Sequence, residues 1–345
     1  MKAFVLLTAM PPTTGHLQLL QFANSLAADG VVAIINTQPH EPFPTERVAA
    51  LKQAIERTGM GKRVTLIHYD KAIEQNPSAP GFWDMWRTML VDFGITGQDI
   101  IVASERYGKK LAEITGTEFF PYDIDRTINS AKGTPIRNNP SAHFANIIPE
   151  FQPYLRTRIT VFGAESTGKT TLSRELAQAL NATWLFEYAR PYLEETVNEI
   201  TPRSMTAIWQ GQRALQEHAN IISASSFIVQ DTDLFSTVGY WSFPHWQSVI
   251  GTCPQGLIDD AIRLKSDLYI ITKSNIPFEA DPLRYGGDKR EGSDEYWLTL
   301  CKQYDLPYVI LDTANQTERL TQALAAAHES AYVKYKELFF DRHNL

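Results

Sequence analysis

The most constraining feature of the sequence is a phosphate-binding loop in its middle. The stretch GAESTGKT, from Gly163 to Thr170, matches the pattern GxxxxGK[ST] and lies between the apolar run ITVF and the helical stretch TTLSRELAQAL. Glycines in such a loop let backbone amides turn toward an anion, and the start of the following helix adds positive potential. A strand, this loop and a helix in that order predict an α/β domain that binds a nucleotide on a parallel sheet.

Each part of this loop has a predicted task. We expect Lys169 to reach the β- and γ-phosphates of ATP, and the Thr170 hydroxyl to bind Mg²⁺. Further phosphate contacts are expected from the remaining glycines and hydroxyl-bearing residues of the segment, which are Gly163, Ser166, Thr167, Gly168 and Thr171. The sequence therefore predicts a kinase-type site that uses ATP and Mg²⁺ as cofactors.

Polar residues after other apolar runs complete the predicted site. Asp231 directly follows FIVQ and is the predicted Mg²⁺ ligand, whereas Asp233 either contacts substrate or caps the next helix. Glu187 is predicted to accept the proton of a substrate hydroxyl, with Arg190 steadying phosphate charge; a surface ion pair is the alternative. Arg284, within DPLRYGGDKR, is predicted to belong to a lid that excludes water, or else to a solvated charged loop.

The length of 345 residues exceeds what one compact core usually holds, so two domains are expected. Apolar runs alternate with helical stretches twice along the chain, which predicts two doubly wound parallel sheets, in domains 1–150 and 156–345. The predicted strands are 3–7, 31–35, 64–68, 100–103, 159–162, 183–186, 227–230, 268–271 and 308–311. The predicted helices are 15–28, 45–57, 169–180 and 203–224.

Charge and composition exclude several classes of protein. The net charge of −7 gives no general electrostatic basis for coating nucleic acid or an anionic membrane. No apolar run approaches the roughly 18 residues of a membrane span, and the apolar start is interpreted as a first strand and not a signal peptide. The two cysteines, Cys253 and Cys301, have no metal-type spacing and are expected to be reduced. We therefore expect a cytoplasmic protein without membrane insertion, and the sequence leaves a homo-oligomer open.

A second candidate site lies in the first domain. Thr13, Gly15 and His16 belong to TTGH, which follows the first strand and opens a helix, as in nucleotidyltransferases with the (H/T)xGH motif. In that chemistry a nucleoside monophosphate attacks the α-phosphate of ATP, and the imidazole with helix-terminal amides stabilises the charge that develops. Taken alone the motif is weak, since a histidine in a first helical turn is more often a surface residue.

A companion motif strengthens this prediction. KGTPIR, from Lys132 to Arg137, resembles the ISxTxIR signature, in which a hydroxyl and an arginine hold the β- and γ-phosphates of ATP. Lys132, Thr134 and Arg137 are therefore predicted to contact phosphate. Trp83 and Trp86, in GFWDMWR, either offer a flat face to an aromatic base or pack in the core.

With these motifs placed, the chain resembles the bifunctional nicotinamide mononucleotide adenylyltransferase/ribosylnicotinamide kinase family of NAD salvage, almost from end to end. The matching segments are TTGH at 13–16, SERYG at 104–108, DIDR at 123–126, GTPIRNNP at 133–140, GAESTGKTT at 163–171, EYARPYLEE at 187–195, DTD at 231–233 and DPLR at 281–284. The chain departs from the family at Leu7, Ala9 and Thr13, which stand at glycine, phenylalanine and histidine positions, and at Lys132, which replaces a serine.

The resemblance implies two consecutive reactions. The second domain would phosphorylate ribosylnicotinamide from ATP, and the first would join the resulting mononucleotide to ATP, giving NAD and pyrophosphate. Two alternatives stay open: another nucleoside kinase fused to a different nucleotidyltransferase, and a sensor that binds ATP and NAD without turnover. Some relatives carry an N-terminal helix-turn-helix domain; because none precedes Met1, we do not expect DNA binding.

Overall fold

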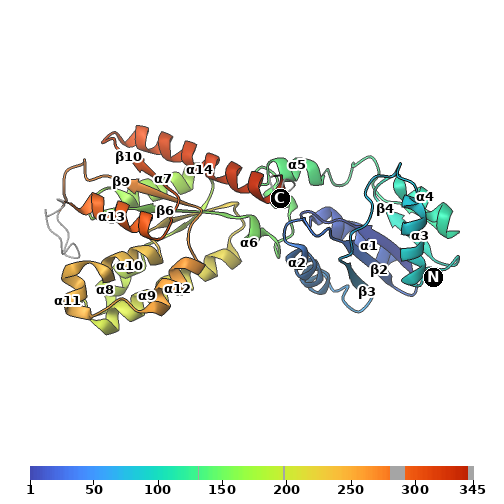
Figure 1. Cartoon of the computed structure of the whole chain (residues 1–345), viewed down its shortest axis with the longest axis horizontal. Helices are drawn as coiled ribbons and strands as arrows, with labels where there is room; N and C mark the ends of the chain where they lie inside the picture. The colour runs from blue at the N-terminus through green and yellow to red at the C-terminus, as the bar shows by residue number, and fades with distance from the viewer. Residues whose placement is uncertain (131, 197–198, 280–291, 341–345) are drawn as a thin grey trace. The chain divides into compact units, whose positions relative to one another are not determined.

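The chain forms two compact α/β units, seen here in a computed structural model that describes residues 1–130, 132–196, 199–279 and 292–340. One unit comprises Met1–Leu155 together with the end of the last helix from Tyr335, and the other comprises Arg156–Lys334. Each unit contains a five-stranded sheet whose neighbouring strands are all parallel (Figure 1). The predicted fold class, two parallel sheets covered by helices, is confirmed.

The first sheet has the strand order β3-β2-β1-β4-β5. Its strands are β1 (Ala3–Leu7), β2 (Val31–Asn36), β3 (Val64–Tyr69), β4 (Ile100–Ala103) and β5 (Glu118–Pro121). Strand β1 pairs with β2 on one side and with β4 on the other, so the strand order reverses direction at β1. In doubly wound sheets ligands bind at such a reversal, beyond the carboxyl ends of the strands. The loop that contains TTGH begins there.

The helices of the first unit follow the strands in turn. They are α1 (Thr14–Leu26), α2 (Pro44–Arg57), α3 (Phe82–Asp92), α4 (Tyr107–Thr115), α5 (Gly133–Asn138), the 3₁₀ turn η1 (Phe144–Asn146) and α6 (Gln152–Leu155). The core between sheet and helices includes Phe4, Ile34, Leu90, Ile101 and Leu111. Phe4, Ile34 and Ile101 come from apolar runs that form strands, which explains why those strands could be predicted, and Leu90 and Leu111 come from α3 and α4.

The second sheet has the strand order β10-β9-β6-β8-β7. Its strands are β6 (Thr157–Phe162), β7 (Thr183–Leu185), β8 (Phe227–Asp231), β9 (Leu268–Thr272) and β10 (Tyr308–Leu311). The central strand β6 lies between β8 and β9, and all three are almost fully buried. The loops after β6, β8 and β9 therefore meet at one edge of the sheet, which is where the phosphate-binding loop begins.

Eight helices accompany this sheet in the described part of the chain. They are α7 (Lys169–Ala179), α8 (Ala189–Glu195), α9 (Pro202–Ile222), α10 (Leu234–Ser242), α11 (Pro244–Ile250), α12 (Gln255–Arg263), α13 (Ser293–Gln303) and α14 (Gln316–Phe339). The core of the unit is aromatic, with Phe162 in edge contact with both Tyr269 and Trp297. The predicted helices 169–180 and 203–224 correspond to α7 and α9.

Two further expectations concern the chain as a whole. Cys301 is buried and Cys253 is half-buried, and neither forms a disulfide. Within the residues that the structure describes, no helix is both long enough and apolar enough to cross a membrane.

Candidate active sites

The phosphate-binding loop follows β6, and its shape depends on glycine. Gly163 has φ of +134°, and a Cβ there would lie 2.7 Å from the carbonyl oxygen of Thr272 on β9. Gly168, the N-cap of α7, has φ of +83°. Ser166 also takes a positive φ, a conformation that side chains other than glycine adopt rarely. The loop is thus wrapped tightly over the sheet edge, as a cradle for an anion requires.

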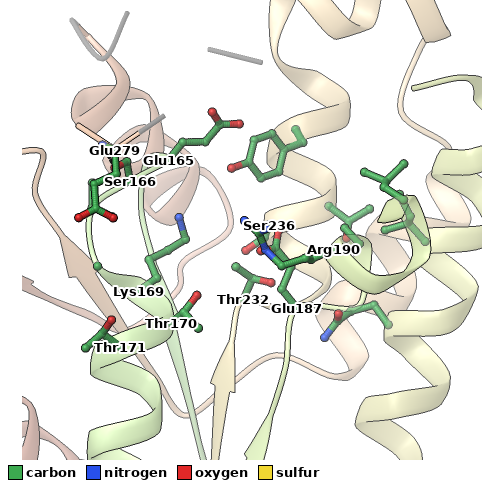
Figure 2. A pocket seen from close by; sticks show the side chains of 18 of the residues that line it. Glu165, Ser166, Lys169, Thr170, Thr171, Glu187, Arg190, Thr232, Ser236 and Glu279 are labelled. Carbon is green, nitrogen blue, oxygen red and sulfur yellow. Dashed lines mark hydrogen bonds between the residues drawn. The ribbon is translucent and has the colours of Figure 1, made fainter. Parts of the chain in front are cut away.

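A cavity of about 390 Å³ opens beside this loop. Figure 2 shows Lys169 and Thr170 on one side of it and Glu187, Arg190, Thr232 and Ser236 opposite them. An apolar part of the wall is formed by Leu193, Ile200, Met205, Ile208, Tyr240 and Trp246. Such a cavity, apolar with a few convergent polar groups, suits a small organic substrate. Among the predicted residues, Ser166, Thr167, Gly168 and Thr171 also line it, while Gly163 lies behind them.

Two oxygen-bearing side chains at this site, those of Thr170 and Asp231, suit Mg²⁺. Thr170 lines the cavity, and Asp231 is hydrogen-bonded to Thr170 without lining the cavity itself. Asp231 ends β8 with 2% of its surface exposed, and its Oδ1 has no hydrogen-bond partner in the described structure. Burial raises the pKa of this carboxyl, while a hydrogen bond with Thr170 and the charge of Lys169 oppose that rise. The described residues contain no group of three or more His, Cys, Asp or Glu side chains that could hold a metal ion. Mg²⁺ does not need one, since it uses one or two carboxylates with phosphates and waters.

Lys169 and Glu187 face the same space from different elements. Lys169 Nζ donates to the carbonyl oxygen of Ala164 at 2.6 Å, within the loop itself. Burial is the largest influence on Glu187 and raises its pKa; the Lys169 charge opposes this and the Asp231 charge adds to it. These mutual influences place Glu187, Lys169 and Asp231 within one electrostatic environment, which is common at catalytic sites.

Helix α9 holds the segment that carries Glu187 and Arg190. Tyr188 packs on Gly211 so closely that a Cβ on Gly211 would lie 1.9 Å from the tyrosine ring. The amide of Tyr188 donates to Gln212 Oε1 at 3.0 Å. Arg190 lines the cavity and also forms an exposed ion pair with Glu194 at 3.2 Å, which is the alternative considered for it; its contact with phosphate stays a prediction.

Asp233 serves as a helix cap, the alternative role considered for it. Its carboxylate accepts from the amides of Phe235 at 2.9 Å and Ser236 at 3.3 Å, and from the Tyr269 hydroxyl at 2.7 Å. It is 2% exposed, it does not line the cavity, and burial raises its pKa to about 6. The predicted substrate contact is therefore corrected: the carboxylate faces the core, where these three donors and the Thr160 hydroxyl at 3.4 Å satisfy it.

Several cavity residues were not predicted. Thr232, between the two aspartates, has φ of +69°, which is a true outlier for a β-branched residue and typical of functional sites. Ser236 and Gln212 also line the cavity, and Gln212 Nε2 has no hydrogen-bond partner in the described structure. The sequence DTD offered a signal for Thr232, but nothing in the sequence pointed to Gln212. Arg284 lies outside the described residues.

In the first unit, His16 is held by the loop that precedes its helix. Thr13 is the N-cap of α1; its amide donates to His16 Nδ1 at 2.9 Å, and its hydroxyl lies 2.8 Å from the same atom. Since a backbone amide can only donate, Nδ1 accepts and the ring proton resides on Nε2. Burial, with a smaller contribution from the Arg126 charge, lowers the pKa of His16 to about 4. The imidazole of His16 is therefore neutral and can donate a hydrogen bond from Nε2.

The companion motif approaches the same loop. Arg137 donates from NH1 to the carbonyl oxygen of Met10 at 2.9 Å and from NH2 to Thr134 Oγ1 at 3.0 Å. Lys132 is the N-cap of α5, and it lines a second cavity of about 320 Å³ together with Gly133, Thr134 and Arg126. The two predicted motifs, 13–16 and 132–137, therefore lie close together in the folded unit.

Arg126 is an unpredicted cation of this region. It has φ of +58°, and its NH2 lies 3.3 Å from Glu105. The turn that carries it is held by Asp123, whose carboxylate accepts the backbone amides of Thr127, Ile128 and Asn129 at 2.7, 3.0 and 2.9 Å. The DIDR segment supplied a signal for Arg126. Only the structure, however, shows that Arg126 lies near His16.

The tryptophans of α3 pack against the core. Trp83 and Trp86 both contact Phe82, with ring centroids 4.9 and 6.0 Å apart. Neither lines either of the two cavities described above, and Trp86 Nε1 is buried without a hydrogen-bond partner in the described residues. Their packing against the core cluster agrees with the alternative considered for them, and stacking on a base stays a prediction.

The chain is similar to known proteins in its sequence and in its fold. Residues 158–319 match a family model described as an AAA domain. The trifunctional NAD biosynthesis/regulator protein NadR of Salmonella typhimurium is 26% identical over 264 residues, covering 72% of this chain and 62% of that protein. The chain thus spans about three fifths of the length of the curated relatives it matches.

Two crystal structures share the fold. NadR protein in complex with NR has a TM-score of 0.68 at 22% identity, with 96% of both chains covered. NadR protein in complex with NAD and AMP-PNP has a TM-score of 0.67 at 22% identity, with 95% of both chains covered. The likeness therefore includes both α/β units.

Proposed function

We propose that this chain, a member of the NadR-like family, makes NAD in two steps: its second unit phosphorylates ribosylnicotinamide with ATP, and its first unit joins the product to a second ATP. The relatives' names and bound molecules support NAD salvage as the setting. The observation that carries the proposal is that Lys169, Thr170 and Glu187 line one cavity of substrate size, with the buried Asp231 hydrogen-bonded to Thr170 beside it.

The kinase step follows from these positions. The acceptor hydroxyl of the nucleoside would lie against Glu187, whose carboxylate takes the proton as the hydroxyl oxygen attacks the γ-phosphorus of ATP. The bond between that phosphorus and the β–γ bridging oxygen breaks, and ADP leaves. Lys169 would exchange its contact with Ala164 for the β- and γ-phosphates. Mg²⁺, held by Thr170 and Asp231, would neutralise charge on the phosphates.

The adenylyl step would use the first unit. The phosphate of the mononucleotide attacks the α-phosphorus of ATP, and the bond to the departing pyrophosphate breaks. Neutral His16 would donate a hydrogen bond from Nε2 to the phosphate oxygens that gain charge. Arg137 and Thr134 would hold the β- and γ-phosphates, and Lys132 would add a positive charge at their edge.

A product assay tests the proposal directly. Purified protein is incubated with ATP, Mg²⁺ and ribosylnicotinamide, and ADP, nicotinamide mononucleotide and NAD are followed by chromatography. All three should appear, with the mononucleotide preceding NAD. Accumulation of mononucleotide without NAD would reject the role of the first unit. Faster phosphorylation of deoxynucleosides would favour a different nucleoside kinase, and binding without turnover would favour a sensor.

The pH dependence of the kinase step should reveal Glu187. Glu187 must be ionised to accept a proton. The kcat/KM of the kinase step should therefore rise with pH through the pKa of Glu187 and fall as the pH drops below that pKa. Because burial raises that pKa, the acidic limb of kcat/KM should lie above the ordinary range of glutamate. Glu187→Gln should lower the rate roughly 10²- to 10⁴-fold and remove the limb.

The matched control is Glu194→Gln, an exposed carboxylate of α8, the helix that follows Glu187. It should leave both the rate and the pH profile unchanged. An acidic limb that persists unaltered in Glu187→Gln would show that another group takes the proton.

A further inference from the structure

Arg319 is a buried arginine behind the phosphate-binding loop. It lies in the first turn of α14 with 4% of its surface exposed. Its guanidinium donates from Nε to the Thr313 carbonyl at 2.5 Å, from NH1 to the Thr167 carbonyl at 2.7 Å and from NH2 to the Lys273 carbonyl at 3.3 Å. NH2 also bonds to Asn275 Oδ1. One side chain therefore ties the phosphate-binding loop to the segments that follow β9 and β10.

The charge of this arginine is poorly compensated within the protein. All its acceptors are neutral oxygens, and no carboxylate pairs with it among the residues that the structure describes. Burial accordingly lowers its pKa from the usual arginine value. The start of a helix carries positive potential, which makes this position still less favourable for a cation. Burying an uncompensated charge is expensive, so a nearby anion would be expected to offset it.

The contact with Thr167 links Arg319 to phosphate binding through peptide geometry. In a trans peptide the carbonyl and the next amide point in opposite directions. By drawing the Thr167 carbonyl toward itself, Arg319 turns the Gly168 amide the other way, toward the side where a bound phosphate would lie. NH1 is also close to Gly168, since a Cβ there would lie 3.4 Å from it. Arg319 thus orients the Gly168 amide of the phosphate-binding loop, and its guanidinium lies next to Gly168.

We propose that Arg319 is a positioning residue of the nucleotide site, which aims the Gly168 amide at the triphosphate of ATP and has its own charge offset by that triphosphate. This inference rests on the proposed binding of ATP at residues 163–170. It adds a residue about 150 positions further along the chain, outside the GxxxxGK[ST] segment.

Arg156 provides a matched control in the same unit. It is also buried, at 2% exposure, and also donates to backbone carbonyls, those of Ser225 at 2.9 Å and Asn220 at 2.6 Å. These acceptors lie at the carboxyl end of α9, where a cation is favourable. Arg156 precedes β6, whereas the phosphate-binding loop follows it, so the two arginines serve opposite ends of the central strand.

The test measures binding of Mg-ATP and of inorganic triphosphate to the full chain by calorimetry, with melting temperatures recorded alongside. Arg319→Met should raise Kd for both ligands roughly 10- to 30-fold, because charge and amide orientation are both lost. Arg319→Lys keeps the charge without the planar fork, and should raise Kd about three- to tenfold. In turnover, KM for ATP should rise while KM for the nucleoside changes less than about twofold. Arg156→Met should lower the melting temperature and leave Kd within about twofold.

Wild-type affinity for Mg-ATP in folded Arg319→Met or Arg319→Lys would overturn the inference. Equal loss of affinity in Arg156→Met and Arg319→Met would also overturn it, since the effect would then be general destabilisation. If Arg319→Met does not fold, the lysine variant decides between the same outcomes. The proposed function is tested separately: a parent chain that binds no Mg-ATP, or binds it equally well after Lys169→Ala, would contradict ATP binding at this loop itself.

Discussion

Lys169→Ala should abolish phosphorylation of ribosylnicotinamide, with a loss of about 10³-fold or more, because the amine that would contact the transferring phosphoryl group is removed. Lys169 lines the cavity together with Glu187, and no other lysine lines that cavity among the described residues. Adenylylation of supplied nicotinamide mononucleotide should continue at the parent rate, since it is assigned to the other compact unit. Separate assays of ADP and NAD formation measure the two steps.

The control for this variant is Lys265→Ala, which removes an exposed lysine of the same unit. It should change neither step. Loss of both activities in folded Lys169→Ala would contradict the assignment of the two reactions to separate units, and retention of kinase activity would contradict the role of the loop.

His16→Ala should show the reverse pattern. Adenylyl transfer should fall roughly 10²- to 10³-fold, as expected when a donor to the developing charge is removed, while phosphorylation of ribosylnicotinamide continues. Because the pKa of His16 is lowered to about 4, the imidazole is already neutral between pH 6 and 8 and acts through its Nε2 proton. Between pH 6 and 8 the rate of adenylyl transfer should therefore show no change that comes from titration of His16.

A graded variant sharpens this test. Thr13→Val removes the hydroxyl beside Nδ1 but keeps the backbone amide that fixes the ring tautomer. It should lower the adenylyl rate by only about two- to fivefold. A wild-type adenylyl rate in His16→Ala would place the chemistry elsewhere, and a loss in Thr13→Val as large as in His16→Ala would show that the loop, and not the imidazole, is decisive.

The pattern of apolar residues along the chain was sufficient to predict most of the strands. Strands such as β1 and β4 are buried on both faces, so their residues are apolar throughout and stand out from the polar helices between them. β5 was missed because its pattern is half-exposed and it contains a proline at its end. Strand order could not be obtained from the sequence, since it depends on pairings between distant segments.

The same distinction applies to the sites. Gly163 to Thr170 could be recognised because neighbouring residues build the loop, whereas Arg319 reaches it from 152 residues beyond Thr167. Asp233 could not be assigned from its position, because only the fold brings Tyr269 to its carboxylate. Arg126 and Gln212 depend likewise on contacts with residues far away in the sequence.

The packing of Tyr188 on Gly211 limits how this chain can diverge in sequence. With the ring occupying the space of a missing side chain, even an alanine at 211 would displace Tyr188, and with it the adjoining carboxylate of Glu187 and the guanidinium of Arg190. Glu187 and Arg190 would thus shift together, because both belong to one short segment. A change in acceptor preference that spares the chemistry is therefore expected to arise at other residues that line the cavity, such as Thr237 or Trp246.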